Sequence, residues 1–164
     1  MLTELINIIR KFNRDDCGTA LVEVAITVPL VLLLSAGVFE FSNILNTRLL
    51  LAAGVEDAAR YMARCSDSNW NNCVTLGTNL AVNGAAIGGS ARVTGWTTAE
   101  VHVTTTHTDA VDGSGTQLYL SNTGKVDVVK VSTTLPYSGV VFWDFLGFGT
   151  IDITVSHQER VFGW

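Results

Sequence analysis

Charge is sparse in this sequence, and positive charge is concentrated in one short segment. Asp, Glu, Lys and Arg make up 15% of the 164 residues, the net charge is -5, and hydrophobic residues make up 48%. The only basic run is Arg10, Lys11 and Arg14 near the N-terminus. Proteins that bind nucleic acid carry basic patches, so nucleic acid is not an expected partner. The length leaves room for one domain and a membrane anchor.

Cysteine is also scarce, and its spacing excludes redox and zinc motifs. Cys17 precedes the main apolar stretch, whereas Cys65 and Cys73 follow it with seven residues between them. That spacing does not match a CxxC motif. The seven residues are rich in Ser, Asn and Asp, which suits a loop closed by a Cys65–Cys73 disulfide in an oxidising compartment. The alternative is two free thiols in a reducing compartment.

Motifs of enzymes are missing as well. The sequence has no nucleophile elbow, phosphate loop, zinc-binding helix motif or Cys–His pairing. His102, His107 and Asp109 form the only cluster of ligand-like residues, and no further ligand that would complete a metal site is evident. The two histidines have opposite parity on an extended strand, so they point to different faces. We therefore expect no enzyme, no catalytic residue, no metal and no cofactor.

One apolar stretch is long enough to cross a membrane. From Ala20 to Phe39 the only charged residue is Glu23. Twenty helical residues rise about 30 Å, the thickness of the hydrocarbon core. Three basic residues precede the stretch and only Arg48 follows it closely, so the positive-inside rule places the N-terminus in the cytoplasm. An ordinary secretory signal has a shorter apolar core and is cut after that core.

Glu23 is the most unusual residue of this stretch, because it lies five residues after Gly18. An acid inside a bilayer costs about 2.5 to 3.5 kcal/mol on insertion scales, so it needs a partner. A cut after Gly18 would create one, the free amine of Thr19 on a neighbouring subunit. The alternative is an interfacial acid in the first helical turn, favoured by the helix dipole.

Beyond the membrane stretch, apolar residues recur with the 3.6-residue period of a helix, which predicts a stalk that continues the membrane helix. Its apolar stripe is covered either by the chain's own strands or by a partner subunit. The residues of the stripe are Phe41, Ile44, Leu45, Leu49, Ala52, Val55, Ala59 and Met62.

The rest of the chain predicts a short helix followed by strands. Residues 73–82 suit a helix, and Asn83-Gly84 interrupts it. Apolar residues then alternate with polar ones around Val101, Val126 and Ile151, as in an antiparallel sheet with one buried face. Asn122-Thr123-Gly124-Lys125 resembles the turn of a hairpin whose first strand is 117–120. We expect an α+β fold, with a long N-terminal helix packed on a small antiparallel sheet of three to four strands.

One predicted loop is unusually aromatic. It holds Phe142, Trp143, Phe145 and Phe148 between two predicted strands. If exposed, such a loop is an interaction patch or touches a membrane surface. The alternative is a tucked loop that caps the sheet.

The N-terminal third resembles a known family. The residues that carry the resemblance are Gly18-Thr19-Ala20-Leu21-Val22-Glu23, Pro29 inside the apolar core, Glu40-Phe41 at its end, and Ala58-Ala59-Arg60. This ordered set is similar to the TadE-like family of pseudopilins from the tight-adherence, or Flp, pilus system. The resemblance covers roughly residues 10–64, and the sequence fits TadE better than the related TadF.

The resemblance implies a minor pseudopilin that takes part in assembling a type IVb pilus used for adherence. A prepilin peptidase would cut the chain, with Gly18 as the last leader residue, Thr19 as the mature N-terminus and Glu23 as the acid at mature position five. The implied partners are the peptidase, TadF-like and TadG-like proteins, the major Flp pilin and membrane lipid.

The resemblance also implies a location in the bacterial inner membrane, with the C-terminal domain in the periplasm or on an extracellular pilus. The expected division is a leader at 1–18, a transmembrane and stalk helix at 19–64, and an α+β domain outside the cytoplasm at 65–164. The alternative function is an uncleaved, single-pass anchored protein that binds a ligand outside the cell.

Overall fold

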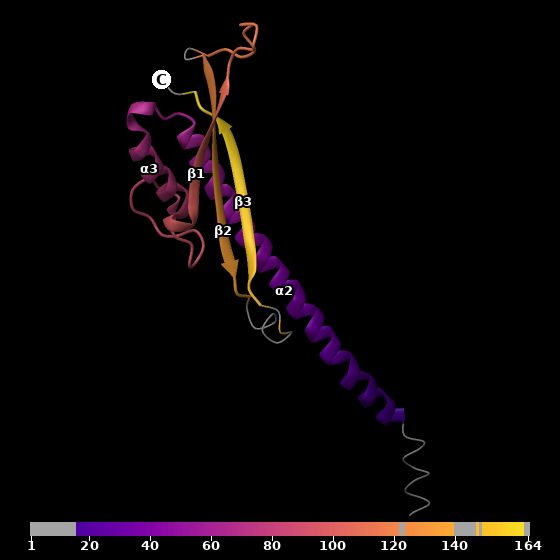
Figure 1. Cartoon of the computed structure of the whole chain (residues 1–164). Coiled ribbons are helices and arrows are strands. Elements are labelled where there is room, and N and C mark those ends of the chain that lie inside the picture. The colour runs from indigo at the N-terminus through magenta and orange to yellow at the C-terminus, as the bar shows by residue number, and fades with distance from the viewer. Residues whose placement is uncertain (1–15, 122–123, 140–146, 148, 163–164) are drawn as a thin grey trace, which may run out of the picture. The chain divides into compact units, whose positions relative to one another are not determined.

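A computed structural model describes residues 16–121, 124–139, 147 and 149–162. The chain divides into two compact units, Met1–Ser42 and Asn43–Trp164. The described elements are two α-helices, two short 3-10 helices and three strands (Figure 1). The expected α+β class, with one long apolar N-terminal helix and a small antiparallel sheet, is confirmed.

Helix α2 spans Asp16–Met62, 47 residues, and belongs to both units. Pro29 lies inside it. Proline has no N–H for the preceding turn, and a membrane helix tolerates this better than a helix in water, because nearby side chains and helices satisfy the freed carbonyl. Six residues after Pro29, Ser35 Oγ donates to the carbonyl of Val31 at 2.8 Å, which is the usual way for a serine to stay inside an apolar helix.

Helix α3 spans Trp70–Asn83, which confirms the predicted short helix and extends it by three residues at its start and one at its end. It ends at Gly84, whose φ of 69° is the left-handed conformation that glycine adopts without steric cost. The N–H of Gly84 donates to the carbonyl of Leu80 at 3.0 Å. The sequence signal Asn83-Gly84 therefore marks the helix end correctly.

The sheet has three antiparallel strands in the order β1-β2-β3. They are β1 at Val101–Asp109, β2 at Lys125–Tyr137 and β3 at Ile151–Arg160. The β1–β2 ladder runs without a bulge from Val101↔Thr133 to Asp109↔Lys125. The β2–β3 ladder runs without a bulge from Val128↔Arg160 to Tyr137↔Ile151. Strands therefore form at the three places where apolar and polar residues alternate.

The predicted hairpin is wrong in its first strand. Residues 117–120 form no strand, and Gln117 makes only an isolated bridge to Val111. The partner of β2 is β1, across a connection from Ala110 to Gly124. In the first half of that connection, Asp112 Oδ1 accepts the N–H of Ser114 at 2.9 Å and of Thr116 at 2.8 Å.

Pro136 lies in the central strand, where proline is normally excluded because it cannot donate to a ladder. Its place in the register explains the exception. Pro136 pairs with Asp152 of β3, whereas β1 begins at Val101 opposite Thr133, three residues short of the proline. Beside Pro136 the central strand has one neighbour, so one side of its backbone needs no donor.

The core of the second unit lies between the sheet and the two helices. The largest fully buried side chains are Trp96, Leu51, Met62, Val55, Val129, Val131 and Thr133. Trp96 Nε1 donates to Thr133 Oγ1 at 2.9 Å, which satisfies both polar groups inside the core. On the stalk helix the predicted stripe is only partly right. Leu51 and Ala58 join the core, while Leu45 and Leu49 are more than half exposed.

Candidate functional site

The predicted processing site lies on helix α2. Gly18 and Thr19 are both helical, and a Cβ added at Gly18 would meet nothing within 4 Å. Gly18 is also exposed. The backbone on either side of the Gly18–Thr19 bond is therefore not enclosed by other described parts of the chain.

Glu23 lies one helical turn after Thr19 and is exposed. Its apolar neighbours are exposed too, with Leu21 at 72%, Val22 at 60% and Val24 at 57%. No hydrogen bond or ion pair joins Glu23 to another residue in the part of the chain that the structure describes. A carboxylate surrounded by exposed apolar side chains needs a partner from outside the chain if the helix enters a membrane.

The helix that carries Glu23 is long and apolar enough to cross a membrane. Within Gly18–Met62 its most apolar window of 18 residues has a mean hydropathy of 2.3, and none of that window is buried by the rest of the chain. It is the one such helix in the described ranges. A single N-terminal apolar helix of this kind fits a membrane anchor. Near the end of the apolar stretch Glu40 is buried, whereas Phe41 is 62% exposed.

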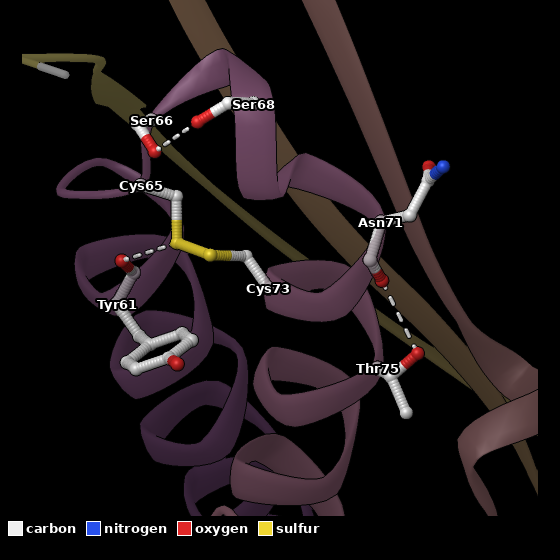
Figure 2. Close-up of a disulfide and its surroundings, with 7 residues drawn as sticks. All are labelled: Tyr61, Cys65, Ser66, Ser68, Asn71, Cys73 and Thr75. Atoms are coloured by element: carbon white, nitrogen blue, oxygen red, sulfur yellow. Dashed lines mark hydrogen bonds between the residues drawn. A yellow bond between two sulfur atoms is a disulfide. The ribbon is translucent and has the colours of Figure 1, made fainter.

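Cys65 and Cys73 form a disulfide, with 6.4 Å between their Cα atoms (Figure 2). Both residues are buried, at 7% and 4% exposure. The bond joins the segment just after α2 to the second turn of α3, so it holds the two helices together where the chain reverses. The expected cysteine pair is therefore bonded.

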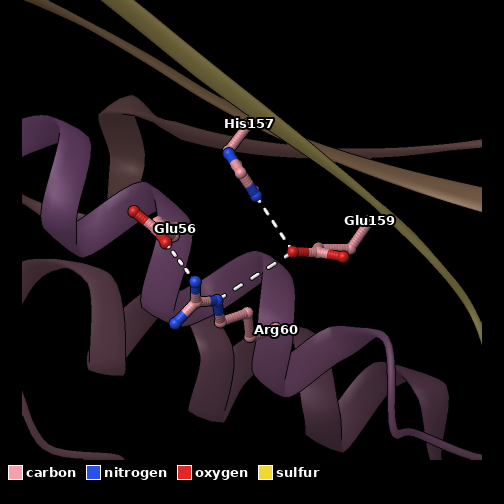
Figure 3. A network of polar contacts seen from close by, with 4 residues as sticks. All are labelled: Glu56, Arg60, His157 and Glu159. Carbon is pink, nitrogen blue, oxygen red and sulfur yellow. Dashed lines mark hydrogen bonds and ion pairs between the residues drawn. The ribbon is translucent and has the colours of Figure 1, made fainter.

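A chain of charged side chains connects α2 to β3 (Figure 3). Arg60 pairs with Glu56 one turn earlier, and its Nε lies 4.0 Å from Glu159 Oε1. The same oxygen of Glu159 lies 3.0 Å from His157 Nε2. The Arg60 side chain is 61% exposed, so each pair contributes little to stability. The arrangement is a polar contact between the last turns of α2 and the end of β3.

The histidines of β1 lie as their parity predicts. His102 pairs with Ser132 and is exposed, whereas His107 is on the opposite face, with Nδ1 2.6 Å from Asp127 Oδ1. Among the described residues, no three His, Cys, Asp or Glu side chains are grouped so that they could hold a metal ion. The predicted aromatic loop, with Phe142, Trp143, Phe145 and Phe148, lies outside the described residues.

Two contacts of the stalk helix were not foreseen in the sequence. Gly54 lies so close to its neighbours that an added Cβ would be 2.4 Å from the Ala81 carbonyl oxygen and 2.7 Å from Trp96 Cη2. Asp57 pairs with Arg92 Nη2 at 2.5 Å, across 35 residues of chain. A glycine inside a helix is the only signal that hints at the first contact, since glycine there is otherwise unfavourable.

Residues 18–60 match the model of a protein family described as TadE-like protein. In this segment the chain is similar to that family. The match begins at Gly18 and ends at Arg60, so it includes Glu23, Gly54 and the basic residue of the Arg60–Glu159 pair. A TadE-like segment indicates a protein associated with the Tad pilus. Neither a curated protein nor a solved structure matches the chain.

Proposed function

We propose that this protein is a minor pseudopilin, made with a leader at 1–18, cut by a prepilin peptidase and used in assembling a Tad/Flp type IVb pilus. Its role is structural, as in other TadE-like pilus components. Mature subunits would begin at Thr19 and keep the membrane helix.

The observation that carries the proposal is the setting of Glu23. Its carboxylate lies among exposed apolar side chains on a helix of membrane length, five residues after Gly18. In a bilayer a lone acid of this kind costs about 2.5 to 3.5 kcal/mol. The ammonium group of a neighbouring Thr19, released by the cut, would offset that cost and set the axial position of one subunit against the next.

The disulfide supports a location of the second unit outside the cytoplasm. Structural disulfides persist in oxidising compartments such as the periplasm and are rare in the cytosol. Basic residues before the apolar stretch favour the same orientation, with the N-terminus inside. The proposed partners in that compartment are TadF-like and TadG-like proteins and the major Flp pilin, and lipid surrounds the anchor.

The test is the mature N-terminus, measured by mass spectrometry of the protein extracted from membranes with and without its cognate prepilin peptidase. A chain that begins at Thr19 only when the peptidase is present supports the proposal. An intact Met1 in both samples would leave an uncleaved anchored protein, in which Glu23 is an interfacial acid.

A further inference from the structure

The bond that the proposed peptidase would cut lies inside a helix. Helix α2 begins at Asp16, so the Gly18–Thr19 bond belongs to its first turn and not to a loop before it (Figure 1). Proteolysis concentrates at exposed loops and chain ends, where the backbone is free of regular hydrogen bonds. In the structure as it stands, the Gly18–Thr19 backbone is instead part of a regular helix.

The carbonyl of Gly18 is the group that a peptidase has to reach. Hydrolysis adds the oxygen of a water molecule to this carbonyl carbon, breaks the bond from that carbon to the nitrogen of Thr19, and transfers a proton of the water to that nitrogen. In a regular α-helix the oxygen of this carbonyl accepts the N–H of residue 22. A peptidase stabilises the negative charge that develops on the same oxygen with donors of its own. Opening the turn removes the helix bond and lets those donors and the water approach.

No other element of the described chain covers this turn. Residues 18–35 are all exposed, and the most apolar window of α2 has none of its surface buried by the rest of the chain. The other end of α2 is different, because Leu51, Val55 and Met62 are fully buried in the core. Chain ends with few buried contacts open with the lowest free energies. Opening the first turn of α2 therefore breaks local helix bonds and no core contact.

Gly18 makes this opening easier. Glycine inside a helix is less favourable than alanine, because it loses more backbone freedom when it becomes helical. Crowding does not explain the glycine at this position, since an added Cβ would meet nothing within 4 Å. At Gly54, by contrast, the added Cβ would lie 2.4 Å from the Ala81 carbonyl oxygen. Within the chain, the effect of Gly18 is therefore on backbone freedom and not on packing.

We propose that the first turn of α2 opens before the peptidase cuts the Gly18–Thr19 bond, so that the rate of processing follows the fraction of chains in which this turn is open. The inference rests on the proposed cleavage after Gly18 and adds a conformational step to it. When opening and closing are faster than the cut, proteolysis tracks the equilibrium population of the open form. A change that weakens the helix beside the bond should then speed processing.

The same substitution at two places along α2 tests the proposal. Ala20→Gly weakens the helix at the second residue after the bond, whereas Ala25→Gly makes the same change about two turns beyond it. Both alanines are exposed, so neither substitution removes a contact that holds the second unit together. The full chain in detergent micelles is incubated with its cognate prepilin peptidase at low substrate concentration. Mass spectrometry follows the appearance of the chain that begins at Thr19.

We expect the initial rate for Ala20→Gly to rise about fivefold over wild type, which corresponds to about 1 kcal/mol of helix propensity. Ala25→Gly should be cut at the wild-type rate, because position 25 is helical whether the first turn is open or closed. A rate for Ala20→Gly at or below that of wild type would overturn the proposal. An equal rise for Ala25→Gly would overturn it too, since the effect would not be local to the bond.

Hydrogen exchange in the absence of the peptidase measures the opening itself. The amides from Thr19 to Leu21 should exchange faster in Ala20→Gly than in wild type, by about the same factor as the rate of cutting. Faster exchange without faster cutting would show that opening does not control processing, which contradicts the proposal.

Failure of the proposed function is visible separately. A wild-type chain that keeps Met1 in the presence of the peptidase would remove the cleavage, and this inference with it. A wild-type chain cut to begin at Thr19, with Ala20→Gly cut no faster, would leave the pseudopilin proposal intact and exclude the opening step.

Discussion

At the scale of single residues, two positions of the TadE-like segment act in different ways. Glu23 is exposed on a surface that nothing in the described chain covers, so its role depends on what surrounds the helix. Gly54 is buried where α2 meets α3 and Trp96, so it acts through packing within the chain. The family match includes both, although only one of them can contact another subunit.

For Glu23 we expect Glu23→Ala to abolish pilus assembly while the protein stays in the membrane. Removing the acid removes the proposed partner of the Thr19 amine and also lowers the cost of insertion. Glu23→Asp, which keeps the charge on a shorter side chain, is the matched control and should retain part of the assembly. Counting pili by electron microscopy, with membrane fractionation in parallel, checks both. Normal piliation of Glu23→Ala would contradict the pairing.

For Gly54 we expect Gly54→Ala to destabilise the protein by about 1 to 3 kcal/mol, because the new methyl group overlaps the Ala81 backbone. Gly77→Ala is the matched control in α3. Its new Cβ would meet Met62 Sδ at 3.1 Å and Cγ at 3.3 Å, which are side-chain and not backbone atoms, and alanine favours a helix by about 1 kcal/mol over glycine. Urea unfolding of both variants measures the difference. Equal stability of Gly54→Ala and wild type would show that the helices move apart freely.

At the scale of elements, the contacts between α2, α3 and β3 explain how a membrane-length helix becomes part of a folded unit. The disulfide joins α2 to α3, and the Arg60 pair joins α2 to β3. Trp96, after α3, fills the space that Gly54 leaves and bonds to Thr133 of β2. The last three turns of α2 therefore contact α3, β3 and Trp96.

The disulfide should stabilise this arrangement measurably. Replacing Cys65 and Cys73 by serine removes the cross-link and puts two hydroxyl groups in buried positions. We expect a loss of about 2.5 kcal/mol from the loop closure alone, and the buried hydroxyls add to it. The variant with both cysteines replaced by alanine avoids the second effect. Urea unfolding with and without reductant gives the comparison, and wild type in reductant should match the alanine variant. No difference between them would mean that the bond is not formed in the protein.

At the scale of the whole molecule, stability should depend on acid through two carboxylates outside the α-helices. Hydrogen bonds from Ser114 and then Thr116 lower the pKa of Asp112, and bonds from Thr97 lower the pKa of Glu100. A carboxylate with a lowered pKa in the folded state stabilises the fold above its unfolded pKa, near 4, and that contribution is lost as the pH falls through the folded pKa.

We therefore expect wild type and Asp112→Asn to differ in unfolding free energy at pH 6, and to converge as the pH falls through the lowered pKa of Asp112 in the folded state. The measurement is urea unfolding across this range, followed by tryptophan fluorescence. Asp109→Asn, three residues earlier at the end of β1, serves as the control. A constant difference at every pH would show that the Asp112 bonds act independently of its charge.

Much of this protein follows from patterns of its sequence alone. The apolar run with one acid predicts the long helix, because a 20-residue stretch of this composition has few other stable forms. The alternation of apolar and polar residues around Val101, Val126 and Ile151 predicts strands, because only in a strand do side chains alternate between two faces with a period of two residues. Asn83-Gly84 predicts the end of α3, because glycine reaches the left-handed conformation without cost.

Only the tertiary structure decided which of these elements meet. Strand β2 pairs with β1 and not with 117–120, and local patterns do not encode strand partners. Which side of the stalk helix is buried also followed from packing, since Leu51 is covered and Leu49 is not. A sequence sets local periods and conformations, whereas pairing and burial depend on contacts between residues far apart in the chain, such as Trp96 with Thr133.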